Sequence, residues 1–383
     1  MQPLPWRLEL RDFRVFRRVD FAPEGVVALA APNGAGKTTM NRALQLLSVL
    51  FNRNHEDALS IVSPRLLLHV KATPPGPVLL SLSVGDVTWR LRLPVDSQGL
   101  TGRFGEELLR GGELVTRAAM HQQDWFHHDK RRTMPMNEQR CCARIVWDEE
   151  RPDWLEPLFR LLSTLRVHSD YQLARLTGPW QRGGRHTYLH PTGANLWTVL
   201  DNWQGSRKYT EQYNWTLDFA RRAFPDLISG IDFSPFLGVY RPDAPEEAIP
   251  PELLANGLLT GLCHLTAVAG AEDGATLTFD EVDDSLHPHA IRTILAAMRQ
   301  RANERGLTIL LTTHSPVVLN DFRADPSQVY IIERGVAGAE PGRSEVLPLT
   351  EARDPNWLSH FELGDLYAAE DIASQSALAA AGA

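Results

Sequence analysis

A glycine-rich segment near the start of the chain contains the residue types that bind phosphate. It lies between an apolar run and a segment whose apolar residues recur at helical spacing. In such a loop, backbone N–H groups converge on a phosphate, a lysine reaches the outer phosphates and a hydroxyl binds Mg²⁺. Lys37 and Thr38 are the lysine and the hydroxyl here, so the segment predicts a nucleoside triphosphate site. The residues expected to line it are Asn33, Gly34, Ala35, Gly36, Lys37, Thr38 and Thr39.

One position of this loop departs from the usual pattern, in which a glycine opens the loop. Ala31 stands there and adds a methyl group where the strand turns into the loop. We expect this methyl group to tighten the pocket without closing it. Only four of the 39 basic residues are lysine, so background frequency is a poor explanation for the lysine in this loop.

Two adjacent acids follow a later apolar run. Asp280 and Glu281 come directly after Leu277–Phe279, which is expected to be a strand. An acidic pair after a strand is common, but with a phosphate loop upstream it matches the acids that such a site needs. Asp280 is expected to hold Mg²⁺, directly or through water, and Glu281 to act as the general base that polarises the attacking water.

A histidine ends the next expected strand. His314 follows Thr312 and Thr313, which places it at the carboxyl end of the sheet, where ligands bind in open α/β folds. A lone histidine is usually structural, but this one is expected beside the acidic pair. We therefore expect His314 to hydrogen-bond the γ-phosphate and to sense its loss.

The elements that must position these residues form an α/β pattern. Residues 26–31 are expected to be a buried strand, and 38–51 the helix after the loop. Residues 275–281, 288–304 and 307–313 read as strand, helix and strand, the order of a parallel unit. Further expected elements are an antiparallel meander over 66–95, helices over 196–203 and 213–224, and a final strand pair, VYIIER and SEVLPL.

Composition fits a globular protein. The chain has 383 residues, of which 43% are hydrophobic, and no apolar stretch approaches the roughly 18–20 residues of a membrane span. The charged N-terminus lacks a signal-peptide core, so we expect a cytoplasmic protein with no membrane partner. The three cysteines lack metal or disulfide spacing and are expected to be ordinary thiols.

The combined segments resemble a known group of ATPases. LELRDFRVF, APNGAGKTT, FDEVDDSLHP and LLTTHSP are similar to the ABC-type ATPase heads of the SMC, RecF and overcoming-lysogenisation-defect group. The nearest resemblance is to its compact AAA-type ATPases, which lack a long coiled coil and a toprim domain. Weaker similarities are HPTGANLWTVL (190–200) and FELGDLY (361–367).

This resemblance implies a fold and its division. The fold is an α/β P-loop NTPase, an ABC-ATPase-like head with a mixed sheet, a β-meander lobe and an inserted helical lobe. The expected parts are an N-terminal part of the ATPase core with the antiparallel lobe (1–100), an inserted, mainly helical lobe (101–250), the C-terminal part of the core (251–350) and a C-terminal extension with a frayed tail (351–383).

The resemblance also implies MgATP hydrolysis in an ATP-sandwich homodimer. Each nucleotide would lie between the P-loop of one subunit and a signature motif of the other. That motif falls at Leu253–Gly257, where Asn256 and Gly257 would bind the nucleotide and Ala255 replaces a serine that would touch the γ-phosphate. Hydrolysis is therefore expected to be slow. Asp283 and Asp284 occupy the place of the dimer-forming D-loop.

Two functions remain open at this stage. In the first, the protein is a DNA-linked sensor or motor that acts with a separate effector, such as a nuclease, in prokaryotic genome defence or repair. In the second, it is a slowly hydrolysing, ATP-gated scaffold that holds or releases a protein partner without acting on DNA.

The distribution of charge along the chain indicates which part would contact DNA. Residues 251–383 carry 8 basic and 19 acidic residues, whereas residues 1–250 carry a net charge of +3. If the protein contacts DNA, the contact is therefore expected in the middle of the chain, but basic runs of this kind are usually solvated faces. The candidate basic clusters are Lys130–Arg132, Arg182–Arg185, Arg207-Lys208 and Arg221-Arg222.

Overall fold

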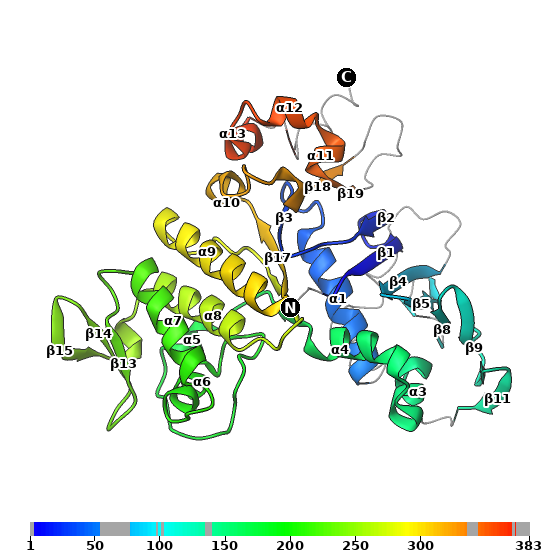
Figure 1. The fold of residues 1–383 in the computed structure, drawn as a ribbon, viewed down its shortest axis with the longest axis horizontal. Coiled ribbons are helices and arrows are strands. Elements are labelled where there is room, and N and C mark those ends of the chain that lie inside the picture. Colours follow the sequence, from blue (N-terminus) through cyan, green and yellow to red (C-terminus); the bar gives the residue numbers. More distant parts are fainter. Residues whose placement is uncertain are drawn as a thin grey trace.

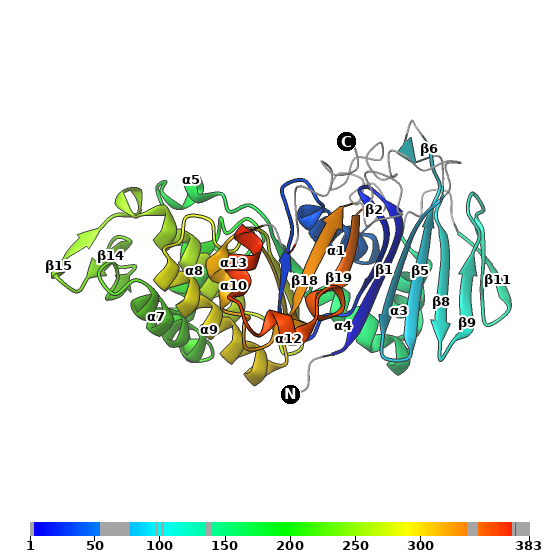
Figure 2. The same ribbon diagram turned by 90° about the horizontal axis from the view of Figure 1, so that it is seen from above.

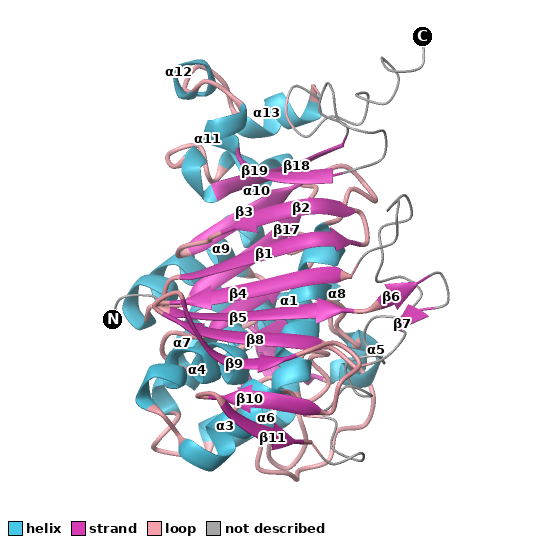
Figure 3. Cartoon of the chain, turned by 90° about the vertical axis from the view of Figure 1, so that its right-hand side faces the viewer, coloured by secondary structure: helices cyan, strands magenta, loops and turns pink. Residues whose placement is uncertain are grey.

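The structure, a computed structural model, describes residues 4–53, 77–96, 99–100, 103–134, 140–334, 344–369 and 372. Within these ranges, its main feature is a mixed sheet of 14 strands. They are β1 (Trp6–Phe13), β2 (Phe16–Phe21), β3 (Val26–Ala30), β4 (Val78–Val84), β5 (Val87–Leu93), β8 (Gly105–Arg110), β9 (Glu113–Ala118), β10 (Asp124–His127), β11 (Lys130–Thr133), β12 (Arg166–His168), β16 (Thr276–Phe279), β17 (Thr308–Thr313), β18 (Val329–Arg334) and β19 (Ser344–Pro348). Across the sheet the order is β11-β10-β9-β8-β5-β4-β1-β2-β19-β18-β3-β17-β16-β12. Figure 3 shows the part from β1 through β4, β5, β8 and β9 to β10 and β11.

Helices and two small sheets surround this sheet. The helices are α1 (Lys37–Asn52), α3 (Cys142–Glu150), α4 (Glu156–Thr164), α5 (Leu173–Leu176), α6 (Leu196–Gln204), α7 (Thr210–Ala223), α8 (Asn256–Ala269), α9 (Pro288–Arg305), α10 (Pro316–Asn320), α11 (Leu349–Ala352), α12 (Pro355–Leu358) and α13 (Leu363–Ala368). The small sheets consist of β6 (Val95–Asp96) with β7 (Gly99–Leu100), and of β13 (Gly230–Asp232), β14 (Gly238–Arg241) and β15 (Ala244–Ile249).

The parallel part of the sheet contains β12, β16, β17, β3 and β18. Every residue of β3, β16 and β17 is buried, as expected for parallel strands that are covered on both faces. Alternate residues of β3 face different cores. Ala28 packs in a core formed by helices α6–α9, whereas Leu29 packs in a core formed by α1 and the antiparallel strands. The expected strand–helix–strand unit over 275–313 is present as β16, α9 and β17.

The antiparallel strands β4, β5 and β8–β11 form a wing, which begins beside β1. Burial alternates along them, as in β4 and β5, because one face covers a core and the other faces solvent. The expected meander is therefore present over 78–93, whereas residues 66–76 lie outside the described ranges. The final strand pair is also present, as β18 and β19.

The segment 101–250 is not one helical lobe. Its first part forms β8–β11, which lengthen the wing; these strands are short and joined by tight turns, so their alternation is weak in the sequence. Helices α3 and α4 then pack in the core of the wing and α1. Strand β12 completes the parallel part of the sheet, so the helical lobe begins only after His168.

The lobe and the wing lie on opposite sides of the parallel strands. Figures 1 and 2 show α5–α9 with the β13–β15 sheet on one side, and the wing with α3 on the other. The C-terminal helices α11–α13 lie near β18 and α10. No helix among the described residues is long and apolar enough to cross a lipid bilayer.

A buried carboxylate joins the wing to helix α3. Glu106 on β8 accepts hydrogen bonds from Trp89 Nε1 at 2.8 Å, from Cys142 N at 2.6 Å and from Ala143 N at 2.8 Å. The two backbone donors belong to the start of α3, where N–H groups have no partner within the helix. Glu106 thus satisfies three donors that are buried with it.

Replacing this carboxylate should destabilise the fold. Glu106→Ala leaves the three donors without their acceptor, and each such loss costs about 1–3 kcal/mol, so we expect the free energy of unfolding to fall by roughly 3 kcal/mol or more. Denaturant unfolding measures this change. Glu107→Ala is the matched control, because Glu107 pairs with the exposed Arg92 at 3.0 Å and its loss should cost less than about 1 kcal/mol. Equal losses in the two variants would contradict the assignment.

Candidate nucleotide site

The glycine-rich loop connects β3 to α1, as the sequence predicts. Gly36 precedes the helix with a φ of 129°, a conformation that favours glycine. A Cβ at Gly36 would come within 2.8 Å of both Phe16 and Val15, so packing also requires a glycine there. Gly34 has a φ of 71°. The loop therefore presents its backbone, with Asn33 to Thr39, at the N-terminal end of a 16-residue helix.

Ala31 fits this loop without distorting it. Its side chain is fully buried in the core that α1 shares with the wing. Its carbonyl oxygen accepts a hydrogen bond from Lys37 Nζ at 2.8 Å. The methyl group thus packs into the core, while the carbonyl oxygen binds the Lys37 side chain in the site.

The Lys37 side chain ends between this carbonyl and the strand that carries His314. Its Nζ lies 2.6 Å from His314 Nε2. Burial lowers the pKa of Lys37 to about 8, although the nearby carboxylates of Glu281, Asp280 and Asp283 raise it. Burial and the charge of Lys37 lower the pKa of His314, which favours a neutral imidazole.

Thr38 and Asp280, the two residues expected to bind the metal ion, are in direct contact. Thr38 Oγ1 donates to Asp280 Oδ2 at 2.9 Å, and Thr312 Oγ1 donates to the other oxygen of the same carboxylate. A hydroxyl and a carboxylate are hard oxygen ligands of the kind that Mg²⁺ prefers. The donor set at this point therefore fits Mg²⁺, with Thr38 and Asp280 as its protein ligands.

Glu281 has a constrained backbone and an open side chain. Its φ is 51°, which is uncommon for a residue other than glycine, and its N–H donates to Thr312 Oγ1 at 2.8 Å. The side chain is 61% exposed, and Oε1 lies 3.9 Å from His314 Nε2. The hydrogen bond from the backbone thus turns the carboxylate out toward the space beside His314.

The signature-like residues lie elsewhere on the chain surface. Helix α8 begins at Asn256, and Ala255 caps it without a side-chain hydrogen bond. A Cβ at Gly257 would lie 2.5 Å from the carbonyl oxygen of Ser285, so this end of α8 packs on the loop that contains Asp283 and Asp284. The structure thus joins Lys37, Thr38, Asp280, Glu281 and His314 in one place, and Gly257 packs on the loop that follows the acidic pair.

The same loop is attached to the strand of His314. Thr313 Oγ1 donates to Asp283 Oδ1 and accepts from Ser315 N at 2.8 Å. Val282 N also donates to the carbonyl oxygen of Thr312, at 3.1 Å. Movement of this loop is therefore coupled to the backbone on both sides of His314.

Sequence reasoning assigned no role to Tyr367, which lies in the site. Its hydroxyl donates to the Ala31 carbonyl at 3.1 Å and lies 3.2 Å from His314 Nδ1. The FELGDLY similarity includes this tyrosine, but Ala31 is 336 residues away in the sequence. Only the resemblance singled out the segment, and nothing in the residues themselves pointed to this contact.

One of the four basic clusters of the middle segment lies apart from the others. Lys130–Arg132 lies on β11 at the end of the wing, whereas the other three clusters belong to the lobe on the opposite side (Figure 1). Several of their arginines are ion-paired, including Arg132 with Glu150 at 3.0 Å and Arg182 with Asp201 at 2.7 Å. This placement weakens the expected DNA contact.

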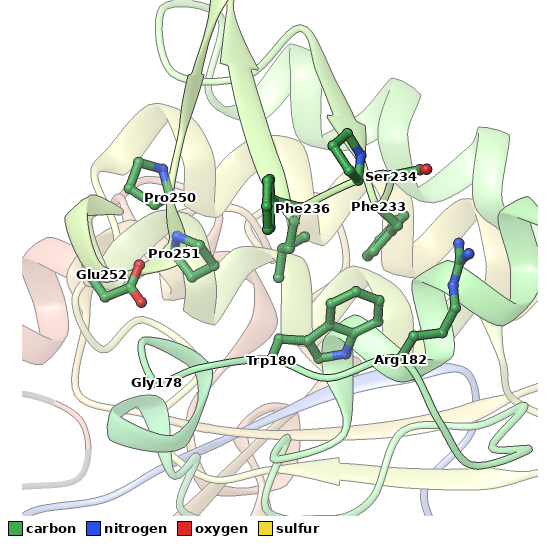
Figure 4. A pocket seen from close by; sticks show the side chains of 11 residues that line it. Gly178, Trp180, Arg182, Phe233, Ser234, Phe236, Pro250, Pro251 and Glu252 are labelled. Carbon is green, nitrogen blue, oxygen red and sulfur yellow. The ribbon is translucent and has the colours of Figure 1, made fainter.

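A separate pocket of about 370 Å³ lies in the helical lobe (Figure 4). Trp180, Phe233, Pro250 and Pro251 line it, and Phe236 stands at its edge with 82% of its surface exposed. None of the expected site residues lines this pocket.

Comparison with known proteins supports the fold. Residues 238–320 match the family described as "AAA domain, putative AbiEii toxin, Type IV TA system", a range that includes the start of α8, the acidic pair and His314. No curated protein matches the chain. Among solved structures, the SMC head bound to the C-winged helix domain of ScpA is 16% identical, with a TM-score of 0.51; the match covers 92% of this chain and all of that one. The SMC head domain from Thermotoga maritima is 14% identical, with a TM-score of 0.49 over 91% of this chain and 99% of that one.

The fold class expected from the sequence is thus confirmed. The similarity to the SMC head covers 92% of the chain, and the family model covers the segment that contains the acidic pair and His314. The chain thus has a mixed α/β fold similar to that of the SMC head, with the glycine-rich loop between β3 and α1.

Proposed function

We propose that the chain binds and hydrolyses MgATP and that two copies enclose the nucleotide. The observation that carries this proposal is the convergence of Lys37, Thr38, Asp280, Glu281 and His314 at the carboxyl ends of β3, β16 and β17. These residues supply a phosphate-binding cation, magnesium ligands, a general base and a γ-phosphate contact. Together they match the needs of phosphoryl transfer to water.

Binding begins at the loop. The N–H groups of residues 33–39 and the positive end of α1 favour the β-phosphate, and Lys37 exchanges the imidazole of His314 for phosphate oxygens. Thr38 and Asp280 would hold Mg²⁺, which neutralises charge on the β- and γ-phosphates. ATP with Mg²⁺ is thus the substrate form.

Hydrolysis then depends on Glu281. Its exposed carboxylate accepts a proton from the water that attacks the γ-phosphorus. The bond from that phosphorus to the bridging oxygen breaks, which gives ADP and phosphate. His314 hydrogen-bonds the γ-phosphate. Because the residues beside His314 are bonded to the loop that contains Asp283, loss of the γ-phosphate moves this surface loop.

The second half of the site would come from another copy. The start of α8 has exposed residues, Ala255 and Asn256, and a helix of 14 residues whose dipole favours an anion. A partner subunit that places this end of α8 on the γ-phosphate would complete the site. Ala255 cannot supply the hydroxyl of the usual serine, so one hydrogen bond, worth about 1–3 kcal/mol, is missing.

A slow switch is the second candidate function. The missing hydroxyl at Ala255 favours it, since ATP binding and dimerisation need only the helix end and the loop. In this form the ATP-bound dimer is a scaffold that holds or releases a protein partner. One SMC head similar to this chain is bound to a winged-helix domain of another protein, ScpA.

The DNA-linked role rests on the sequence resemblance. It would make the protein a sensor or motor for a separate effector, such as a nuclease, in prokaryotic genome defence or repair. Lys130–Arg132 lies apart from the other basic clusters, and several arginines of these clusters are ion-paired. The ATPase assay below is therefore run both with and without DNA.

The ATPase rate separates these functions. Wild type should hydrolyse ATP, and Glu281→Gln should reduce kcat on the order of 10²-fold or more, because it removes the general base. Glu272→Gln, an exposed acid in the loop before β16, is the control and should keep the wild-type rate. The assay is run with and without double-stranded DNA. Stimulation by DNA supports the sensor or motor, and a slow rate that DNA does not change supports the scaffold. A Glu281→Gln variant as fast as wild type would refute the assignment of the base.

Trapping the ATP state should reveal the dimer. Glu281→Gln binds MgATP without turning it over, so light scattering should give twice the mass of the 42.9 kDa chain when ATP is present. Lys37→Ala should bind no ATP in calorimetry and should stay at its nucleotide-free mass. A Glu281→Gln protein that binds ATP and does not change mass would contradict the sandwich.

ATP affinity should fall at alkaline pH. Lys37 has a pKa of about 8 without nucleotide, and phosphate binding favours its charged form. The Kd for ATP should therefore rise above pH 8, by up to about tenfold per pH unit. Calorimetry from pH 7.5 to 9.5 measures this. In Lys37→Arg, whose guanidinium stays charged, any remaining affinity should not change with pH. A constant Kd in wild type would contradict the position of Lys37.

A further inference from the structure

Helix α13 is held firmly against the nucleotide site. Leu363 is fully buried and Leu366 nearly so. Gly364 N donates to Asn320 Oδ1 at 2.6 Å, and a Cβ at Gly364 would lie 2.4 Å from the carbonyl oxygen of Pro316. Both partners belong to α10, which begins two residues after His314. Helix α13 is therefore fixed to the element that carries the histidine.

The last turn of α13 places one hydroxyl between two parts of the site. Tyr367 Oη lies 3.1 Å from the Ala31 carbonyl oxygen and 3.2 Å from His314 Nδ1. Lys37 Nζ contacts the same carbonyl at 2.8 Å and the other imidazole nitrogen, Nε2, at 2.6 Å. Ala31, Lys37, His314 and Tyr367 thus close a ring of four hydrogen-bonded groups.

Lys37 Nζ also lies 3.3 Å from His314 Nδ1, so the ammonium group contacts both imidazole nitrogens. A carbonyl only accepts, so the Tyr367 hydroxyl gives its own proton to Ala31, and Oη accepts from Nδ1 when Nδ1 carries the ring proton. The Tyr367 hydroxyl thus connects one imidazole nitrogen to the backbone at the start of the phosphate loop.

We propose that Tyr367 is the positioning residue of His314, and that its hydroxyl fixes the orientation of the imidazole that the histidine presents to the nucleotide. This inference rests on the proposed function, in which His314 contacts the γ-phosphate. When Lys37 moves to the phosphates, His314 needs a proton on Nε2, because phosphate oxygens accept. The Tyr367 hydroxyl can then turn and donate to Nδ1, so it supports both tautomers.

Tyr367→Phe tests this role, because it removes the hydroxyl and keeps the ring. We expect kcat for ATP to fall roughly tenfold while KM changes by less than about twofold, since the hydroxyl touches no substrate. Tyr330→Phe is the matched control: Tyr330 also donates to a backbone carbonyl, that of Ala22, at 3.0 Å, but lies outside the site. This variant should keep the wild-type kcat. Similar losses of kcat in both variants, or none in Tyr367→Phe, would overturn the proposal.

A spectroscopic measurement tests the contact without using activity. ¹⁵N NMR of histidine-labelled, nucleotide-free protein, with His314→Ala to identify the signals, resolves the two ring nitrogens of His314. Tyr367→Phe should shift the Nδ1 signal, because Nδ1 loses a hydrogen-bond partner, whereas Tyr330→Phe should not. An unchanged Nδ1 signal in Tyr367→Phe would refute the inference even if wild type hydrolyses ATP. Conversely, if Tyr367→Phe shows the shift but wild type fails to hydrolyse ATP, only the proposed function is refuted.

Discussion

The parallel pairing of β16, β17 and β3 is the constraint on which the site depends. Their register sets Phe279 beside Leu311, and Thr313 beside Ala30. Because neighbouring parallel strands end at the same edge, the residues that follow each strand must meet. The P-loop follows β3, the acidic pair follows β16 and His314 follows β17. Sequence segments almost 280 residues apart thus become one site.

Hydrogen bonds from β17 hold the acidic residues of the site in place. The Thr312 hydroxyl holds both the Asp280 carboxylate and the backbone of Glu281, so one β17 residue aligns two acids. Thr313 joins the next turn to Asp283. These buried threonines point from β17 toward β16 and the loop after it. They explain how two neighbouring acids can have different environments, with Asp280 bound to hydroxyls and Glu281 turned to solvent.

Much of this arrangement could be predicted from the sequence, because it depends on local patterns. Strand β3 and the loop after it follow from a continuous apolar run and glycines, and β16, α9 and β17 from clear periodicity. The strands β8–β11 were missed because they are short and their turns interrupt the alternation. Strand β12 has only three residues, and its place beside β16 depends on tertiary packing. The role of Tyr367 was also hidden, since a contact across more than 300 residues has no local signal.

In the proposed ATP-bound dimer, one chain holds half of the nucleotide site and a second copy supplies the rest. A mixture of two inactive variants tests this division of the site. Lys37→Ala removes the phosphate lysine, and Ala255→Glu puts a carboxylate at the exposed start of α8, where it would repel the γ-phosphate. In a twofold sandwich, a mixed dimer keeps one intact site, so an equal mixture should recover up to about a quarter of the wild-type ATPase rate. A mixture that stays as inactive as its two components, although both variants are folded, would contradict the account.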